Sequence, residues 1–489
     1  MIFLEFEILA RFWMRIRCGL VGCFVLASSV GCVSYVDRVE NFRFLWKIGD
    51  AEGAAHEMNG LADASPRRDR LLYRFEEGAV KRLNQDTTGS VQAFEQAESE
   101  ISRYFGSHLT TSVNLPREVI GIVGSPATTP YYSRVYDRVM VNLYQSLNYF
   151  QMRDEGRARA QIFRIRGRVQ DAKDIWKRRL DEAESKRNAN GGVKWDAIRN
   201  DPSFRQKIDQ LYKEPRAGYY RALPEYVNPW AMHLEALYFL STGKDRSDFE
   251  KAEFSLRELK RIFPDDPWID ADHRRAERNM SGVQDKEAFT YLYFATGRAA
   301  SRREFRIDLP ILFFDGTARI PYVGVALPQL LYHERFAPTI NIRAQGVKAS
   351  PELHLLTDMD AIITKEFKKD LPIVTTKAIL GAVAKGGMQY AVNKNLADKD
   401  DTTKLAGQLG TGILAHALTK ADLRTWTTLP KRVLHCRFHT PSNKKLTLRT
   451  NGGKLIKEVK LANGGNTNVI CIRSVSSVTP LVVTSNFAF

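Results

Sequence analysis

The spacing of hydrophobic and polar positions changes along the chain. Between about residues 40 and 280, apolar residues recur every three to four positions, which is typical of amphipathic helices. Over 285–358 and 421–489, short aromatic and β-branched runs are broken by Gly or Pro, which is typical of strands. Two apolar segments rich in small residues lie within 359–420 on either side of a charged stretch, so they predict a helical hairpin. The pattern as a whole predicts a multidomain α+β protein.

The helical half partly repeats itself. Three of its segments match parts of the tetratricopeptide repeat (TPR), a helix pair of about 34 residues in which small residues allow close crossing and larger ones fill the gap. The matching residues are Gly78, Ser90, Phe94 and Ala97, then Tyr144, Leu147 and Ala160, and finally Ala252, Leu256, Leu259 and Pro264. We predict a TPR-like α-helical repeat domain with a first half at 32–190 and a second half at 203–280, joined by a loop at 191–202. An unrelated all-helical bundle is the alternative.

The strand-like ranges are expected to form one domain. Asn451-Gly452-Gly453 lies between two alternating runs and predicts a hairpin, because these residues tolerate the positive φ of a tight turn. We expect strands from 285–358 and 421–489 to pack as a β-sandwich-like domain, with the helical hairpin of 359–420 inserted between them. Membrane insertion of that hairpin is the alternative, which its lysines disfavour.

The N-terminus has the layout of a secretory signal. Residues 18–30 form an apolar stretch after a basic segment, and the stretch is too short to span a bilayer. It ends in Ser29-Val30-Gly31-Cys32, which resembles the bacterial lipobox, where a cysteine is acylated and becomes the new N-terminus. We predict that 1–31 is a lipoprotein signal peptide and that Cys32 is the lipidation site. Translation from Met14 would give a shorter and more basic signal, and a buried N-terminal helix is the alternative.

The composition adds a strong positive charge. The chain has 73 Lys and Arg against 56 Asp and Glu, for a net charge of +17. Behind a lipoprotein signal, the available anions are phospholipid headgroups, anionic glycans and acidic proteins rather than nucleic acid. The densest basic segment is 153–187, and the candidate anion-binding residues in it are Arg157, Arg159, Arg164, Arg166 and Arg168. The alternative is a solvated helix face on which arginines form charge pairs.

The cysteines bear on the same compartment. Signal cleavage would leave Cys32, Cys436 and Cys471 of the five cysteines. With Cys32 acylated, the other two make one even pair, so a disulfide between Cys436 and Cys471 is one prediction. Two unpaired thiols buried in strands are the other, because the sequence does not give the Cα separation that a disulfide requires.

No familiar catalytic or nucleotide-binding motif occurs in the sequence. The patterns GxxxxGK[ST], HExxH and GxSxG are absent. If 435–439 is a strand, His435 and His439 share a face but lie about 13 Å apart, too far to bind one ion, while Cys436 faces the core. We therefore predict no metal site and no cofactor.

Several aspartates cluster near His273. They are Asp265, Asp266, Asp270 and Asp272. A glycan-cleaving enzyme needs two carboxylates about 5 to 9.5 Å apart in a cleft, which proximity in sequence does not establish. We predict that these aspartates serve the turn and the helix cap and that the protein is not an enzyme.

Two short motifs accompany the signal sequence. Asn228-Pro229-Trp230 starts a predicted helix pair, and Ala421-Asp422-Leu423-Arg424-Thr425-Trp426 leads into Leu429-Pro430 before the last strands. With the lipobox, they resemble an uncharacterised family of bacterial lipoproteins that have a TPR-like N-terminal half and a β-rich C-terminal half. The resemblance implies a role in envelope assembly and supplies no catalytic residues. From the residues themselves, we expect Trp426 to be a core anchor with Asp422 and Arg424 paired beside it.

These observations lead to one main functional hypothesis and two rivals. We expect a non-enzymatic lipoprotein of the cell envelope, in the outer membrane and facing the periplasm because Asp does not follow Cys32. Its TPR-like half would bind an envelope protein, and acyl chains such as palmitate would hold its N-terminus in the membrane. One rival is a binder of cell-wall or surface glycan through the basic helical face. The other is a glycan hydrolase whose site the motifs do not show.

Overall fold

The computed structural model of the protein describes residues 35–64, 67–109, 130–189, 194–283, 287–310, 322–347, 349–396, 420–449 and 455–489. The predicted signal peptide, Cys32 and the turn at 451–453 lie outside these ranges. Contacts divide the chain into two units, Met1–Glu40 and Asn41–Phe489. The described part of the first unit contains the short helix α2 (Tyr35–Arg38) and the first residue of the next helix.

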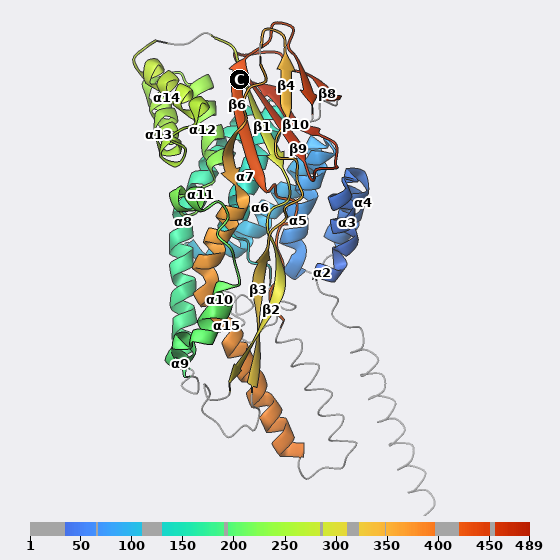
Figure 1. The fold of residues 1–489 in the computed structure, drawn as a ribbon, viewed down its shortest axis with the longest axis vertical. Helices are drawn as coiled ribbons and strands as arrows, with labels where there is room; N and C mark the ends of the chain where they lie inside the picture. The colour runs from blue at the N-terminus through green and yellow to red at the C-terminus, as the bar shows by residue number, and fades with distance from the viewer. Residues whose placement is uncertain are drawn as a thin grey trace, which may run out of the picture. The chain divides into compact units, whose positions relative to one another are not determined.

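The N-terminal half is helical, which confirms the prediction from periodicity (Figure 1). Its helices are α3 (Glu40–Ile48), α4 (Ala51–Ala64), α5 (Arg67–Leu83), α6 (Thr87–Leu109), α7 (Val135–Gln151), α8 (Glu155–Asn188), α9 (Trp195–Asn200), α10 (Pro202–Asp209), α11 (Ala217–Ala222), α12 (Pro229–Thr242), α13 (Arg246–Ile262) and α14 (Pro267–Met280). Asn228 accepts hydrogen bonds from the Trp230 and Ala231 amides, and Pro229 begins α12, so the motif at 228–230 does start a helix.

The segment that was expected to be a loop is partly helical. The prediction for 191–202 is wrong at Trp195–Asn200, which is α9, and at Pro202, where α10 begins. The Asp201 side chain accepts a hydrogen bond from the Phe204 amide and caps α10. Short helices of this kind escape a periodicity test because they contain too few turns, and each buries a single apolar residue here, Ile198 in α9 and Phe204 in α10.

The crossing of α5 and α6 depends on a glycine. A Cβ atom placed on Gly78 would lie 2.5 Å from the Phe94 ring, so only glycine lets the two helices approach this closely. Ser90 adds a hydrogen bond from its Oγ to the Gly78 carbonyl at 2.7 Å. At the second predicted match the details differ, since Ala160 is exposed on α8 and the small buried residue is Ala158.

The C-terminal part contains the strands, again as predicted. They are β1 (Phe289–Thr296), β2 (Ser301–Pro310), β3 (Tyr322–Leu331), β4 (Asn341–Ala344), β5 (His354–Asp358), β6 (Arg432–His439), β7 (Lys445–Arg449), β8 (Leu455–Lys460), β9 (Thr467–Ser474) and β10 (Val482–Ala488). Within the described residues they form a five-stranded sheet in the order β10-β9-β1-β6-β5, a three-stranded sheet β4-β7-β8 and the β2-β3 hairpin. Strands from the two predicted ranges therefore pair with each other.

The five-stranded sheet is covered on both faces. Its central strand, β1, lies parallel to β9 and antiparallel to β6, and all eight of its residues are buried. Leu292 and Phe294 point into an apolar core shared with β4, β7 and β8. Tyr291 and Tyr293 point the other way, toward α12 and α14. A strand buried on both faces has no polar side, which explains the nearly continuous apolar run in its sequence.

This arrangement rules out the predicted disulfide. Cys436 pairs in register with Leu292 and Cys471 with Tyr293, and adjacent residues of β1 point to opposite faces. The two thiols therefore lie on opposite sides of the sheet, with β1 between their strands, beyond the reach of an S–S bond. Both cysteines are free and buried, and burial raises the pKa of the Cys471 thiol to about 12.

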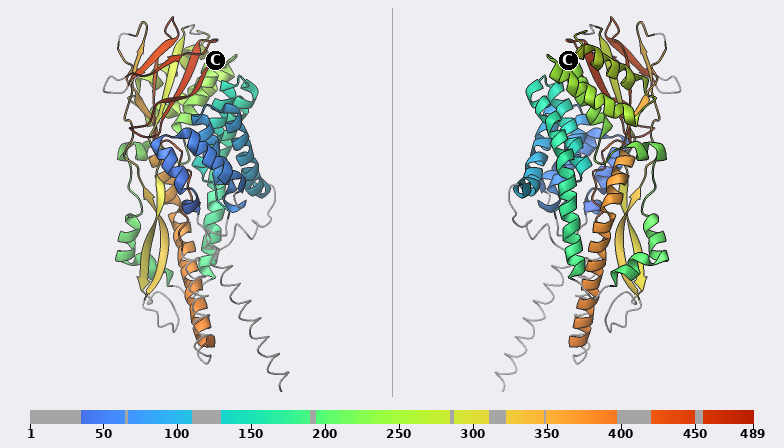
Figure 2. Two further views of the ribbon diagram at one scale, coloured as in Figure 1. Left: turned by 90° about the vertical axis from the view of Figure 1, so that its right-hand side faces the viewer. Right: turned by 90° about the vertical axis from the view of Figure 1, so that its left-hand side faces the viewer.

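The predicted helical hairpin is only partly within the described residues. Its first arm is α15 (Met359–Leu396), which begins directly after β5; the second arm lies outside them. The N-terminal part of α15 runs beside α8 (Figure 2), where Arg179 pairs with Asp370 at 3.1 Å and the Trp176 indole donates to the Lys369 carbonyl. Among the described helices, none combines the length and the apolar character needed to cross a membrane.

The motif at 421–426 joins the C-terminal segment to helix α5. Trp426 is fully buried and stacks on Phe75 of α5 with ring centroids 4.8 Å apart. Arg424 pairs with Asp422 through Nε at 2.8 Å and with Asp69 of α5 at 3.0 Å. The expected core anchor and the expected Asp–Arg pair are both confirmed, and Asp69 is a third member that the sequence did not indicate.

Candidate functional site

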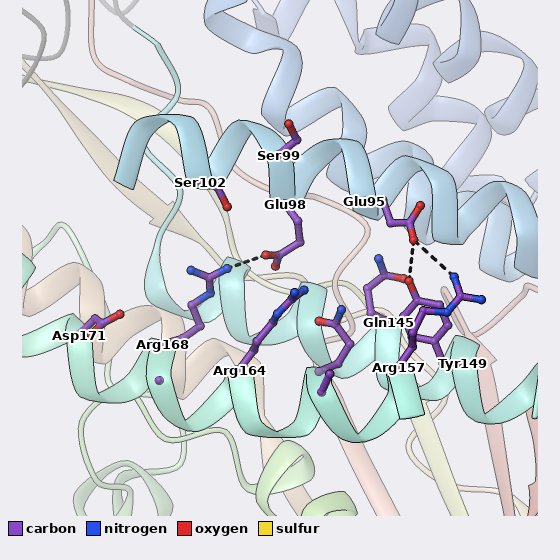
Figure 3. A pocket seen from close by; sticks show the side chains of 13 residues that line it. Glu95, Glu98, Ser99, Ser102, Gln145, Tyr149, Arg157, Arg164, Arg168 and Asp171 are labelled. Atoms are coloured by element: carbon purple, nitrogen blue, oxygen red, sulfur yellow. Dashed lines mark hydrogen bonds and ion pairs between the residues drawn. The ribbon is translucent and has the colours of Figure 1, made fainter. Parts of the chain in front are cut away.

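A groove lies between α6 and the α7–α8 pair. Its volume is about 650 Å³, and it is partly open to solvent. Figure 3 shows the side chains that line it. The described residues that line it are Glu95, Glu98, Ser99, Ser102, Gln145, Tyr149, Arg157, Ala160, Gln161, Arg164, Gly167, Arg168 and Asp171. Three arginines and three carboxylates are among them, so the lining is strongly charged but balanced.

Two of the carboxylates are held in fixed positions. Glu98 receives hydrogen bonds from Arg168 at 2.6 Å and from the Asn142 side chain at 2.7 Å. Glu95 accepts a hydrogen bond from the Tyr149 hydroxyl at 2.8 Å and lies 3.8 Å from Arg157. Burial, and then the hydrogen bond to Glu95, raise the pKa of Tyr149 to about 12, so its hydroxyl remains a donor at neutral pH. These groups form a hydrogen-bonded polar floor.

Two other charges in the groove are available to a ligand. Arg164 is exposed and extends from α8 toward α6 (Figure 3), and no described carboxylate pairs with it. Asp171 lies two turns further along α8, about 10 Å away at 1.5 Å per residue, and no described cation pairs with it. The groove thus presents one positive group near its middle and one negative group at one end of its α8 side, which suits a ligand that carries both charges.

The five arginines predicted to bind an anion do not share one face. Arg157, Arg164 and Arg168 line the groove, whereas Arg159 lies over the Phe163 ring and Arg166 pairs with Glu235 of α12. Positions two apart on a helix point about 200° away from each other, so the set is divided between two sides of α8. Arg157, Arg166 and Arg168 each pair with a carboxylate, as expected if the arginines of α8 form charge pairs. The prediction of one anion site made by all five arginines is therefore wrong.

The Arg166–Glu235 pair gives a prediction for pH. Burial raises the pKa of Glu235 to about 7, against the opposing effect of Arg166. Because this folded-state pKa lies above the ordinary value of 4.5, stability from Glu235 is fully present below pH 4.5 and is lost as the pH rises through 7. Between pH 5 and 8, the free energy of unfolding of the wild type should fall by about 2 kcal/mol more than that of Glu235→Gln, measured by urea titration. Equal slopes for the two proteins would contradict this.

A second polar cluster is buried between the helices and the central sheet. His435 Nε2 donates a hydrogen bond to the Asp266 carboxylate at 2.8 Å, and His233 Nδ1 lies 2.7 Å from the Tyr293 hydroxyl. Asp272 accepts a hydrogen bond from the Tyr291 hydroxyl at 2.7 Å. The two imidazole rings are 5.1 Å apart, so α12, α14, β1 and β6 meet in one polar cluster.

The charges in this cluster compensate one another. Burial alone would raise the pKa of Asp272, but the hydrogen bond with His233 and the charge of Arg437 outweigh it, and the pKa is lowered. Burial lowers the pKa of His435, although Asp266 acts in the opposite direction. All these side chains are almost completely shielded from solvent, so a substrate has no access to them. The cluster holds the helices on the sheet.

The predicted roles of the aspartates hold in part. Asp266 accepts from the amides of Trp268 and Ile269 and caps α14, as expected. Asp272, in contrast, belongs to the buried cluster. His273 contacts Glu253 of α13 and none of the four aspartates. A signal for this was present in the sequence, because Asp272 lies in the same helical stripe as Ile269 and Ala276, and a charge in a buried stripe requires a partner.

The HCRFH segment divides as its alternation predicts. His435 and His439 lie on β6, where His435 is buried and His439 is exposed beside Phe289. Cys436 and Phe438 belong to the apolar core on the other face. Over the described ranges, no three His, Cys, Asp or Glu side chains are grouped so that they could hold a metal ion.

Comparison with known proteins adds no relative. No family model matches the chain, and neither a curated protein nor a solved structure matches it. The indications of function are therefore the sequence signal at the N-terminus and the groove between α6 and α8.

Proposed function

We propose that this protein is a non-enzymatic lipoprotein of a bacterial envelope that binds a partner protein through its helical half. The observation that supports this most directly is the groove between α6 and α8, which has a hydrogen-bonded polar floor and two charges, Arg164 and Asp171, without described partners. Grooves between stacked helix pairs are a common way to bind an extended peptide segment. The lipobox at 29–32 supplies the anchor and the compartment.

We interpret the pairs α5–α6, α7–α8 and α12–α13 as TPR-like units. Support comes from the Gly78–Phe94 crossing and from the burial of Ala252, Leu256 and Leu259 on α13. The five- and three-stranded sheets, which share one apolar core, would then form a sandwich-like second docking module. In this proposal the protein resides in the outer membrane and faces the periplasm.

The charge of the groove favours a peptide over a polyanionic glycan. Three arginines face three carboxylates there, so the local charge is zero although the whole chain is basic. A polyanion would be repelled by Glu95, Glu98 and Asp171. A segment with an acidic residue near Arg164 and a basic residue near Asp171 would pair with both charges.

Site-specific photocrosslinking in cells would test the groove. With a photoreactive residue in place of Ser102, we expect one discrete adduct with an envelope protein. Arg164→Glu should reduce that adduct at least fivefold, because it reverses the charge that receives the partner's carboxylate. Lys177→Glu is the matched control, since Lys177 is also exposed on α8 but lies off the groove, and it should leave the adduct unchanged.

Three results would contradict the proposal. These are no adduct at Ser102, equal losses in Arg164→Glu and Lys177→Glu, or adducts with glycan fragments alone. Clearing of peptidoglycan in a zymogram by the purified protein would favour the hydrolase instead.

A further inference from the structure

Helix α3 exposes large apolar side chains on the face opposite its core contacts. Phe42 and Trp46 are buried, whereas Phe44 is 58% exposed and Ile48 is 50% exposed. Phe44 and Ile48 are four residues apart, so they lie on one side of the helix, one turn from each other. A short helix that is apolar on two sides has more apolar surface than its packing requires.

The exposed side of α3 continues onto the loop between β9 and β10. Gly49, which ends α3 with φ +84°, lies so close to this loop that a Cβ there would be 2.7 Å from Thr479 Cγ2. The neighbouring residue in the loop, Val478, is 85% exposed. On the inner side, the Arg473 guanidinium lies over the Trp46 ring at 5.8 Å and fixes α3 on the end of β9. Phe44, Ile48 and Val478 are called the apolar patch below.

The length of chain before α3 limits how far the patch can be from a membrane. Phe44 follows Cys32 by twelve residues, and even a fully extended chain of that length spans only about 40 Å. Any helical part of the segment between Cys32 and Phe44 shortens this span, because a helix rises only about 1.5 Å per residue. If Cys32 carries acyl chains, α3 is therefore always close to lipid.

The charges near the patch suit an anionic surface. Lys47 is exposed on α3 between the two apolar residues, and no described carboxylate pairs with it. Asp50, the nearest acidic residue after the helix, accepts a hydrogen bond from the Gly53 amide at the start of α4. An apolar side chain flanked by lysine is the composition of segments that lie in the headgroup region of a bilayer.

We propose that Phe44, Ile48 and Val478 insert into the anionic bilayer surface to which the acylated Cys32 is tethered. This contact rests on the proposed lipid anchor and adds an orientation to it. With α3 on the membrane, the body is held in one pose instead of moving at the end of a loose tether.

Vesicle cosedimentation of the full chain carrying Cys32→Ala tests the patch without an acyl chain. The probe is vesicles of phosphatidylethanolamine and phosphatidylglycerol at 3:1, with phosphatidylcholine vesicles for comparison. We expect measurable binding to the anionic vesicles and at least a fivefold loss in Phe44→Glu/Ile48→Glu. The matched control is Phe254→Glu/Val283→Glu, because these residues are 50% and 61% exposed elsewhere on the protein; it should change binding less than twofold.

Several outcomes would overturn the inference. One is equal vesicle binding by Phe44→Glu/Ile48→Glu and its parent, and another is an equal loss of vesicle binding in the patch and control variants. A third is a parent protein that does not bind vesicles but forms a dimer in analytical ultracentrifugation, where Phe44→Glu/Ile48→Glu is monomeric. Matching thermal unfolding curves for both double variants would exclude misfolding as the cause of a loss.

Metabolic labelling with an alkyne fatty acid separates this inference from the proposed anchor. Label should be present in the wild type and in Phe44→Glu/Ile48→Glu and absent in Cys32→Ala. Label that persists in Cys32→Ala would defeat the anchor itself. Normal labelling together with patch-independent vesicle binding would defeat the patch alone.

Discussion

Replacing Trp426 with alanine is expected to lower the free energy of unfolding by about 3 to 5 kcal/mol. The indole is fully buried, and its ring lies 4.8 Å from Phe75, 6.0 Å from Phe94 and 5.9 Å from Tyr144. These partners come from α5, α6 and α7, so one side chain joins the segment before β6 to three helices. Truncation would leave a large cavity that well-packed helices cannot close.

Urea unfolding followed by circular dichroism would measure this effect. Trp426→Phe should cost less, because it keeps an aromatic ring and loses mainly the hydrogen bond from Nε1 to Thr428 Oγ1 at 2.7 Å. Trp176→Ala is the matched control, since Trp176 is only half-buried beside Lys369 on α15. A difference of about 1 kcal/mol corresponds to one net hydrogen bond. If Trp426→Ala lowers the free energy of unfolding by no more than this amount beyond Trp176→Ala, Trp426 does not join the C-terminal segment to the helices.

Asp272→Asn is expected to cost a similar amount, about 3 to 5 kcal/mol. Asp272 is buried, pairs with Arg437 and accepts the Tyr291 hydroxyl. Asparagine keeps the size of the side chain but removes its charge, so the buried guanidinium of Arg437 no longer faces the Asp272 carboxylate. The same guanidinium lies 3.8 Å from the centre of the Phe289 ring. Removing one member of a buried ion pair is costly because the other keeps its desolvation penalty.

The neighbouring aspartate provides the control for this experiment. Asp270 lies on the same helix and pairs with Lys260 and Arg274, but it is partly exposed, so Asp270→Asn should cost less than about 1 kcal/mol. The double variant Asp272→Asn/Arg437→Met should recover part of the loss. An unchanged or higher stability of Asp272→Asn would instead show that the pair with Arg437 does not stabilise the fold.

Both experiments concern contacts between segments that are far apart in sequence. Glu76 of α5 accepts hydrogen bonds from the amides of Thr427 and Thr428 beside Trp426. Arg424 reaches Asp69 on the same helix. The helical half and the strands are thus joined by polar and aromatic contacts as well as by apolar burial.

The sequence by itself determined the features that depend on a few neighbouring residues. Periodicity separated helices from strands because each backbone state imposes its own repeat on the side chains. The caps at Asn228 and Asp266 were predictable for the same reason, since capping bonds span two or three residues. The core face of Cys436 followed from alternation along β6.

Only the tertiary structure decided which of these elements meet. The parallel pairing of β1 with β9 places Cys471 on the opposite face from Cys436, and no local pattern contains that information. The partners of Asp272 and the division of the α8 arginines between two faces were likewise set by helices that arrive from elsewhere in the chain. The physical reason is that side-chain periodicity is fixed within one or two turns, whereas pairing depends on the burial that the whole chain achieves at once.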